Sequence, residues 1–194
     1  MTVRVIDSIN PMLPVYGEGE IREIEDPIAS VPPGEDTRET AEFVYDPSNP
    51  PMIVSSLTRT GGKKADVLKG RAGNYLLNGK LVCDKLTGGA GQDKLAFTTK
   101  LGATNVDRIA DFKHADDTTR LSMAVFGKLQ KGILSKGAFW AGAKAHDKND
   151  RIIYNEKTGD LSYDADGSET KYGAIKFAQV KAGTLLKADD VFVM

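Results

Sequence analysis

Residues 61–96 decide the fold of this chain. They read GGKKADVLK, GRAGNYLLN, GKLVCDKLT and GGAGQDKLA, which are four consecutive nine-residue blocks without an insertion or a deletion. Position 1 is always glycine, position 8 is always leucine, and position 6 is aspartate in three blocks (Asp66, Asp84 and Asp93) and Tyr75 in the second. Self-similarity at a short fixed period predicts a solenoid, in which each repeat stacks on its neighbours.

The fixed positions of the block have physical explanations. Glycine has no Cβ, so it adopts positive φ and lets backbone carbonyls approach an ion. Carboxylates and carbonyls supply the oxygen ligands that Ca²⁺ prefers. The leucines are expected to lie on short strands and to point into a thin core that stacked coils share. They are Leu68, Leu77, Leu86 and Leu95. The alternative, a glycine-rich loop with accidental periodicity, is disfavoured by the strict register.

The fourth block, GGAGQDKLA at residues 88–96, matches every fixed position of the calcium-binding nonapeptide G-G-x-G-x-D-x-U-x. On these residues the chain resembles the RTX, or hemolysin-type, repeat proteins that bacteria secrete. The resemblance implies an all-β fold with a short parallel β-roll, in which two nonapeptides form one coil. The first block would then face the third, and the second would face the fourth. It also implies Ca²⁺ as the ligand of the turns.

The candidate metal ligands follow from this resemblance. They are the position-6 carboxylates and the turn glycines of the second and fourth blocks: Asp66, Asp84, Asp93, Gly70, Gly73, Gly88, Gly89 and Gly91. The second and fourth blocks keep the glycines, but Tyr75 replaces one of their two aspartates. The first and third blocks keep both aspartates but have Lys64, Lys80 and Val82 in place of turn glycines. The site of the second and fourth blocks has the turn glycines but only one carboxylate, whereas the site of the first and third blocks has two carboxylates but lacks turn glycines. We therefore expect weak or degenerate calcium sites.

The segment after the repeats, residues 97–194, carries a second resemblance. It contains DRIIYNEKTGDLSYDADGS, which is similar to the post-repeat region of RTX proteins. Ile152–Asn155 and Leu161–Asp164 flank turn residues and predict a hairpin, and Tyr172–Val180 predicts a third strand. Because two coils alone cannot bury their ends, we expect this segment to form a β meander that caps the roll.

Several residues of this segment have two interpretations. Asp107 and Asp111 are candidates for an additional ion site, but carboxylates at a strand-to-loop junction also cap backbone amides. Thr119 stands where the family has an apolar residue. The stretch Asp164–Ser168 resembles the start of an EF-hand loop, yet its glycine falls at position 4 and Ile175 takes the place of the final glutamate. We therefore predict a hairpin turn there.

Residues 1–60 have a different character. They hold all eight prolines, four arginines, no lysine and eleven acidic residues, a net charge of −7, whereas the remaining residues carry +6. This composition favours a partly extended or disordered acidic arm. Val3–Ile6, Phe43–Tyr45 and Met52–Leu57 are candidates for edge strands. The arm is interpreted either as a partner-binding or covering segment or as a linker. The expected organisation is an arm (1–60), a roll (61–96) and a C-terminal cap (97–194).

Composition and motifs exclude several classes of protein. The chain of 194 residues is 40% hydrophobic and 27% charged, with no apolar run long enough to span a bilayer and no secretory signal of the Sec type. Zinc-protease, serine-hydrolase and phosphate-loop motifs are absent, and His114 and His146 lie far from metalloprotease spacing. Basic residues do not alternate with aromatic ones as in nucleic-acid-binding proteins. A single cysteine, Cys83, excludes an intrachain disulfide and is expected to be a small buried filler. Because these catalytic motifs are absent, we expect that the protein is not an enzyme.

The chain finishes with KADDVFVM, an acidic pair followed by four apolar residues. This pattern resembles the signal that type I secretion ABC transporters read, and it equally fits a closing β-strand. The resemblance implies a secreted, extracellular, non-catalytic calcium-binding protein with an unknown surface partner. Two alternatives stay open: an export and folding module of a larger exoenzyme or adhesin, and a calcium-independent β-roll binding protein.

Overall fold

The computed structural model describes residues 2–6, 38–44 and 53–194, and this part of the chain is all-β, with two mixed sheets. In spatial order, sheet A contains β1 (Thr2–Ile6), β2 (Arg38–Val44), β3 (Ile53–Thr60), β5 (Tyr75–Asn78), β7 (Lys94–Phe97), β9 (Thr118–Leu121), β15 (Val191–Val193) and β10 (Gly132–Ile133). Sheet B contains β11 (Phe139–Ala141), β12 (Ile152–Asn155), β13 (Asp160–Tyr163), β14 (Ile175–Gln179), β8 (Asp107–Ile109), β6 (Lys85–Thr87) and β4 (Val67–Lys69). Two short 3₁₀ helices are η1 (Lys136–Ala138) and η2 (Ala188–Asp190).

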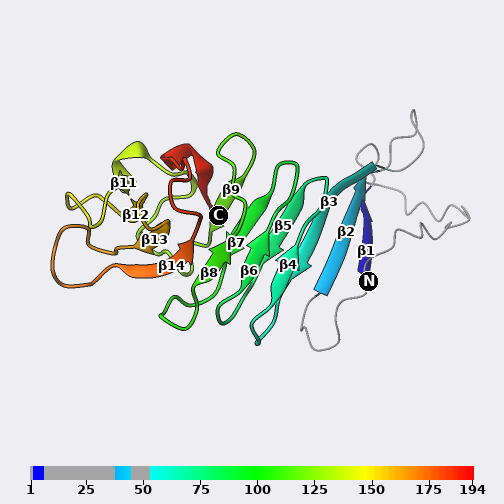
Figure 1. The fold of residues 1–194 in the computed structure, drawn as a ribbon, viewed down its shortest axis with the longest axis horizontal. Helices are drawn as coiled ribbons and strands as arrows, with labels where there is room; N and C mark the ends of the chain where they lie inside the picture. The colour runs from blue at the N-terminus through cyan, green and yellow to red at the C-terminus, as the bar shows by residue number, and fades with distance from the viewer. Residues whose placement is uncertain (1, 7–37, 45–52) are drawn as a thin grey trace, which may run out of the picture.

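From β3 to β9 the chain alternates between the two sheets, one strand at a time (Figure 1). Neighbouring strands of each sheet run parallel in this region. Within the repeats, Val67 pairs with Lys85 and Leu76 pairs with Lys94, an offset of one coil in each sheet. Blocks two apart are therefore neighbours, as expected, because a strand that returns to the same sheet has passed through one complete coil.

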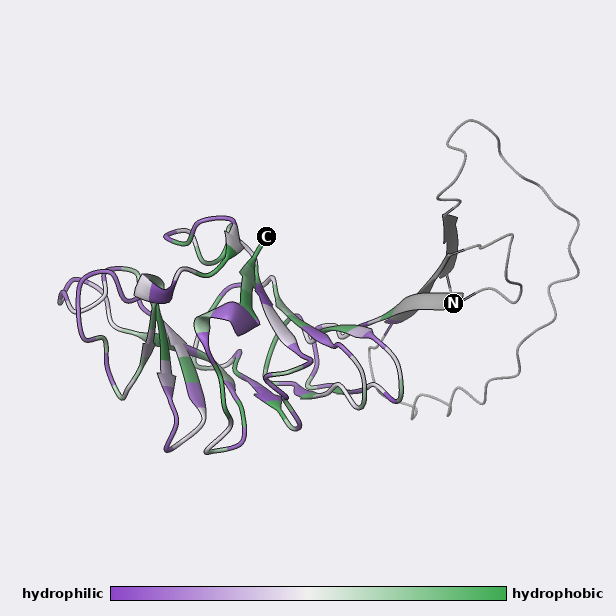
Figure 2. Cartoon of the chain, turned by 90° about the horizontal axis from the view of Figure 1, so that it is seen from above, coloured by the Kyte–Doolittle hydropathy of each residue, from purple (hydrophilic) through white to green (hydrophobic). Residues whose placement is uncertain are grey.

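The position-8 leucines form the core between the sheets. Leu68, Leu77, Leu86 and Leu95 are 2%, 0%, 0% and 1% exposed. In β4 and β6 the residues on both sides of the leucine are exposed or half-buried, whereas Asn78 and Ala96, which follow the leucines of β5 and β7, are buried. Figure 2 shows hydrophobic and hydrophilic residues alternating along the coils. Burying one leucine contributes about 1.5–3 kcal/mol. The predicted inward direction of these leucines is confirmed.

The segment after the repeats continues both sheets. β14 pairs parallel with β8, and β15 pairs parallel with β9. β12, β13 and β14 form an antiparallel meander, so the predicted hairpin and third strand are confirmed. Phe97, Phe126 and Phe177 pack edge to face at ring separations of 5.1 Å and join the cap to the coils. β7 (Lys94–Phe97) runs across the expected boundary between roll and cap at residue 96. The division of the chain at this residue stays a prediction.

The N-terminal segment extends sheet A. β1 runs parallel to β2, β2 antiparallel to β3, and β3 parallel to β5. Val3–Ile6 thus lies in an edge strand, as predicted, whereas the described parts of the other two apolar pieces lie in β2 and β3, which are inside the sheet. Tyr45 and Met52 lie outside the described residues. The acidic, proline-bearing stretch between β1 and β2 lies outside the described residues, as does the link between β2 and β3.

Two further predictions concern turns. Asp164 begins the connection between the antiparallel strands β13 and β14, so a hairpin lies there as predicted. Its Oδ1 accepts hydrogen bonds from the amides of Asp166 (3.2 Å) and Gly167 (3.1 Å). The prediction for Cys83 is wrong, since this residue is exposed. It lies on the outer side of a turn, where its Sγ accepts a hydrogen bond from the Val106 amide at 3.4 Å.

We predict that Thr119→Val stabilises the protein by about 1 kcal/mol. Thr119 is 1% exposed, and its buried hydroxyl has no hydrogen-bond partner. Valine has nearly the same shape and removes the unsatisfied group. Urea unfolding followed by circular dichroism measures the change. Thr118→Val, at a half-buried position of the same strand, is the control and should stay within about 0.5 kcal/mol of the parent. Destabilisation by Thr119→Val alone would show that the hydroxyl is satisfied.

Candidate metal centre

The turns that join the two sheets place aspartates in two buried columns, which we call the aspartate ladders. The first ladder contains Asp66, Asp84 and Asp107, at the starts of β4, β6 and β8. The second contains Asp93 and Asp117, at the starts of β7 and β9, with Tyr75 in the corresponding place at β5. All five carboxylates are at most 6% exposed. Stacked turns therefore bring acidic groups from separate coils into one line.

Each ladder is held by one repeated hydrogen bond. The carboxylate Oδ1 accepts from the backbone amide of the equivalent residue one coil earlier. In the first ladder Asp84 accepts from Asp66 (2.7 Å) and Asp107 from Asp84 (3.1 Å). In the second, Asp93 accepts from Tyr75 (2.9 Å) and Asp117 from Asp93 (3.1 Å). These bonds fix the spacing of the carboxylates along the stack.

The Oδ2 atoms of the ladder aspartates differ in whether they accept a hydrogen bond. Asp66 Oδ2 accepts from the Gly62 amide, and Asp117 Oδ2 from the Lys113 amide, both at 2.8 Å. In contrast, Asp84 Oδ2 and Asp93 Oδ2 are buried and have no hydrogen-bond partner. An unpartnered buried carboxylate oxygen is energetically costly, so these two atoms require a proton or a cation.

The position-1 glycines make room for these oxygens. A Cβ on Gly79 would collide with the carboxylate of Asp84, and a Cβ on Gly88 would collide with that of Asp93. A Cβ on Gly70 would collide first with the Gly88 carbonyl of the next coil and then with the ring of Tyr75. The invariant glycine is therefore a steric requirement of the side chain five residues later.

The other predicted glycines shape the turn backbone. Gly73, Gly89 and Gly91 have φ values of +111°, +97° and +124°. In the third block, Lys80 and Val82 adopt the same left-handed region, with φ of +74° and +68°. The expectation that these substitutions remove the turn shape is therefore wrong for this block. The contacts between coils impose the positive φ on Lys80 and Val82, and the backbone at these two residues is strained because each carries a Cβ.

We predict that Val82→Gly stabilises the protein by about 1 kcal/mol, because a β-branched residue is strained at positive φ and glycine is not. The free energy of unfolding in guanidinium measures the effect. Val67→Gly is the control: Val67 is also partly exposed but lies in a strand, where glycine costs about 0.5–1 kcal/mol. Equal destabilisation by both substitutions would contradict the strain at Val82.

Burial changes the acidity of the ladders. It raises the pKa of Asp84 to about 6, of Asp107 to about 7 and of Asp117 to about 6, and it also raises the pKa of Asp93. The amide hydrogen bonds oppose this shift, and the neighbouring carboxylates add to it. Without a cation, Asp107 is therefore about half protonated at pH 7, and Asp84 and Asp117 are about half protonated near pH 6, the pH values that equal their pKa values.

We therefore expect the protein without a divalent cation to lose stability as the pH rises. A carboxyl whose folded pKa exceeds its unfolded value, about 3.9, binds protons more tightly in the folded state. Its stabilising contribution is complete at low pH and disappears as the pH passes through the folded pKa. Between about pH 4.5 and pH 7.5 the free energy of unfolding should fall by a few kcal/mol, since one pKa unit corresponds to about 1.4 kcal/mol. Urea unfolding in a chelator tests this, and a rise over this range would contradict it.

The predicted ligands fall into both ladders. Asp66 and Asp84 are neighbours in the first, whereas Asp93 lies in the second, beside the turns of the predicted glycines. Asp107 joins the first ladder. Asp111 caps amides, because its two oxygens accept from Gly88 (2.9 Å) and Gly89 (2.8 Å).

Sequence reasoning missed Asp117. The signal was an Asp-x-apolar triplet, which is clear at Asp107-Arg108-Ile109 and matches Asp84-Lys85-Leu86. At Asp117 the third residue is a threonine, and the longer turns before β8 and β9 interrupt the nine-residue period.

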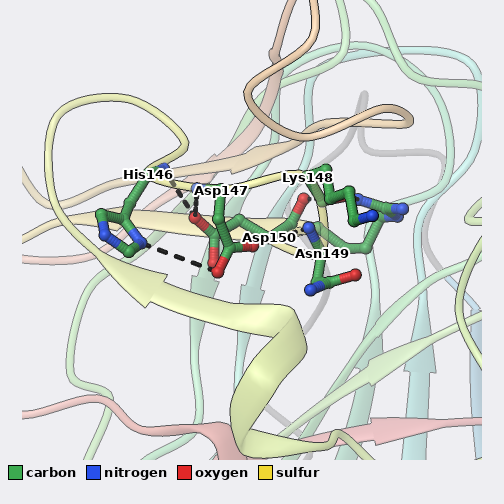
Figure 3. Close-up of polar contacts among 6 residues, drawn as sticks. His146, Asp147, Lys148, Asn149 and Asp150 are labelled. Atoms are coloured by element: carbon green, nitrogen blue, oxygen red, sulfur yellow. Dashed lines mark hydrogen bonds and ion pairs between the residues drawn. The ribbon is translucent and has the colours of Figure 1, made fainter.

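Two histidine–aspartate groups lie outside the ladders. His114 Nδ1 is 2.7 Å from Asp190 Oδ1, and Asp190 Oδ2 accepts from the Lys187 amide at 2.7 Å. In the other group, Asp150 Oδ2 accepts from the amides of His146 (2.6 Å) and Asp147 (2.8 Å), as Figure 3 shows. These contacts supply hydrogen bonds to the buried carboxylates of Asp150 and Asp190 and anchor the loops.

Comparisons with known proteins give no relative: no family model, curated protein or solved structure matches this chain. In the described part of the chain, no helix is long and apolar enough to cross a membrane. The functional assignment therefore depends on the residues and their geometry.

Proposed function

We propose that this chain is a secreted, non-catalytic calcium-binding protein of the RTX type, whose parallel strands form a short β-roll. One observation carries the proposal: Asp84 Oδ2 and Asp93 Oδ2 are buried without a partner, each inside a glycine turn and beside further carboxylates. A hard divalent cation with oxygen ligands compensates such groups. The residues present therefore fit calcium.

The proposed calcium ligands are aspartates of the two ladders. Asp84 and Asp107 would hold an ion in the first ladder, and Asp93 and Asp117 in the second. The amide hydrogen bonds to Oδ1 keep each carboxylate fixed, and Oδ2 of Asp84 and Oδ2 of Asp93 would face the cation. Bound calcium supplies positive charge to the stacked carboxylates. Because it binds the folded state, it adds about 2.7 kcal/mol of stability at a concentration 100 times the dissociation constant.

The affinity should be low. Each ladder offers few carboxylates, and Lys80, Lys85 and Lys94 lie beside them in sequence. Calcium affinity in proteins depends on ligand charge and rigidity, so we expect a dissociation constant of about 10⁻⁴ M or weaker, as in extracellular calcium modules.

Calorimetry of the full chain, freed of metal by a chelator, tests calcium binding, with far-UV circular dichroism as a second readout. We expect saturable heat and a gain in ordered β-structure on adding calcium. Asp84→Asn and Asp93→Asn should each reduce the number of ions bound or weaken binding at least about tenfold. Glu156→Gln, in an exposed hairpin turn, is the control. Absence of heat and of spectral change at about 10 mM calcium would reject the proposal, because sites with the dissociation constants of extracellular modules, about 10⁻⁴–10⁻³ M, are nearly saturated there.

Export by a type I secretion ABC transporter is part of the proposal, as is an extracellular partner. Within the segment KADDVFVM that resembles the export signal, Ala188–Asp190 form η2 and Val191–Val193 form β15, where Val191 and Val193 are 1% and 0% exposed. The transporter would therefore read this segment before the chain folds, and calcium outside the cell would favour folding afterwards.

A calcium-independent β-roll is the second candidate, and the second ladder supports it. The turns there are joined by backbone hydrogen bonds, from Ala90 to the Arg71 carbonyl and from Gly73 to the Ala90 carbonyl, both at 2.8 Å. Tyr75 fills the first turn, with the Arg59 guanidinium 5.6 Å from its ring centroid. The same calorimetry decides between the candidates, since this one predicts native stability in a chelator and no heat.

A further inference from the structure

A cavity of about 340 Å³ lies in the C-terminal segment, away from both ladders. It is bounded by three loops: the one after β9, the one before β12, and the one between β13 and β14. Its lining includes Lys128, Lys148, Asn149, Arg151, Glu169 and Tyr172. A cavity of this size is at the small end of ligand sites, which suits a molecule the size of a monosaccharide.

The lining of the cavity includes three positively charged side chains, Lys128, Lys148 and Arg151, which form no ion pair within the described residues. Asp166 and Glu169 also line the cavity. The Oδ2 of Asp166 accepts from the amides of Lys171 (2.9 Å) and Tyr172 (3.1 Å), and its Oδ1 is buried without a hydrogen-bond partner. Three cations against two carboxylates leave the lining with a net charge of +1, which favours an anion over a free metal ion.

The walls of the cavity are held by main-chain contacts. Arg151 Nη1 donates to the carbonyls of Lys148 (2.7 Å) and Asp150 (2.9 Å), which orients the guanidinium. The Asp147 carbonyl accepts from the Ser168 amide at 2.9 Å and ties two of the loops together. Figure 3 shows Lys148 and Asn149 on the side of this loop opposite His146. A site with fixed walls loses little conformational entropy when it binds a ligand.

We propose that this cavity binds a small organic anion that carries hydroxyl groups. Lys128, Lys148 and Arg151 contact the anionic group, since Arg and Lys are the usual partners of carboxylates. Asn149 and Glu169 hydrogen-bond to the hydroxyls, because an amide and a carboxylate accept from them. The half-exposed ring of Tyr172 (51% exposed) forms an apolar wall. This activity is independent of calcium binding by the ladders.

Titrations of the full chain with D-glucuronate, D-glucose and acetate, followed by NMR chemical shifts in calcium-containing buffer, test the proposal. Glucuronate carries both kinds of group, glucose only hydroxyls, and acetate only the charge. We expect glucuronate to bind with a dissociation constant of about 1 mM and at least about tenfold more tightly than the other two. Equal binding of acetate would overturn the proposed class, and no saturation by about 50 mM glucuronate would overturn the site.

Two variants link the binding to this cavity. Lys148→Gln and Lys128→Gln should each weaken glucuronate binding at least about fivefold, because each removes one cation that contacts the anionic group. Both side chains are exposed, so the fold should be unchanged, and an unchanged urea midpoint verifies this. Lys157→Gln, which removes an exposed lysine from the β12–β13 turn, is the matched control and should bind like the parent. Binding unaffected by both cavity variants would place the ligand elsewhere and refute the inference.

Discussion

Leu86→Asp should unfold the protein even in saturating calcium. Leu86 is fully buried in β6, between β4 and β8, where its side chain belongs to the core that the coils share. The substitution removes a buried leucine and places an unpaired carboxylate in an apolar environment. We expect a loss of at least about 4 kcal/mol, a large part of the 5–15 kcal/mol that stabilises a typical domain. Circular dichroism and urea unfolding measure it.

Leu81→Asp is the matched control for this experiment. Leu81 belongs to the same nine-residue block but lies in the turn and is 41% exposed, so a carboxylate there remains hydrated. We expect its effect to be within about 0.5 kcal/mol. If Leu86→Asp kept native stability, the register that points position 8 inward would be wrong.

Tyr75→Asp should make the fold strongly dependent on calcium. Tyr75 is 3% exposed, and its ring occupies the place that the carboxylate takes in the other blocks. In a chelator the variant should lose at least about 3 kcal/mol, because a buried ring is exchanged for a carboxylate. With calcium, the second ladder gains a third carboxylate next to Asp93, and binding should tighten at least about tenfold, which is about 1.4 kcal/mol.

Tyr75→Asn is the control that distinguishes the effect of the new carboxylate charge from the effect of the smaller side chain. Asparagine has the size of aspartate but no charge, so it should lose stability in a chelator without the gain in calcium affinity. Calorimetry of the two variants and the parent gives the comparison. A similar gain with asparagine, or no gain with aspartate, would show that the ion does not bind at this position.

The repeat region could be predicted because its turns have constant length. With no insertion between Gly61 and Ala96, an 18-residue separation in sequence becomes adjacency in a sheet, so Asp66 and Asp84 were placed together correctly. Beyond Ala96 the two following turns are longer, and the separation between ladder members grows to 23 and 24 residues. Periodicity alone therefore leads to Asp93 but not to Asp117.

Other features depend on contacts that no local pattern contains. The left-handed conformations of Lys80 and Val82 follow from the stacking of their turn on its neighbours, although intrinsic preference disfavours them. The exposure of Cys83 follows from its place on the outside of the same turn. The parallel pairing of β1 with β2 joins segments more than thirty residues apart, and neither segment carries a repeat that would give the register.

Calcium binding by the buried ladder carboxylates is tested most directly by anomalous diffraction from crystals of the full chain grown with calcium. We predict anomalous peaks at about 2.3–2.6 Å from Asp84 Oδ2 and from Asp93 Oδ2, the distances of calcium–oxygen bonds. A map in which both oxygens have no ion beside them, while calcium lies only on exposed carboxylates, would contradict the assignment.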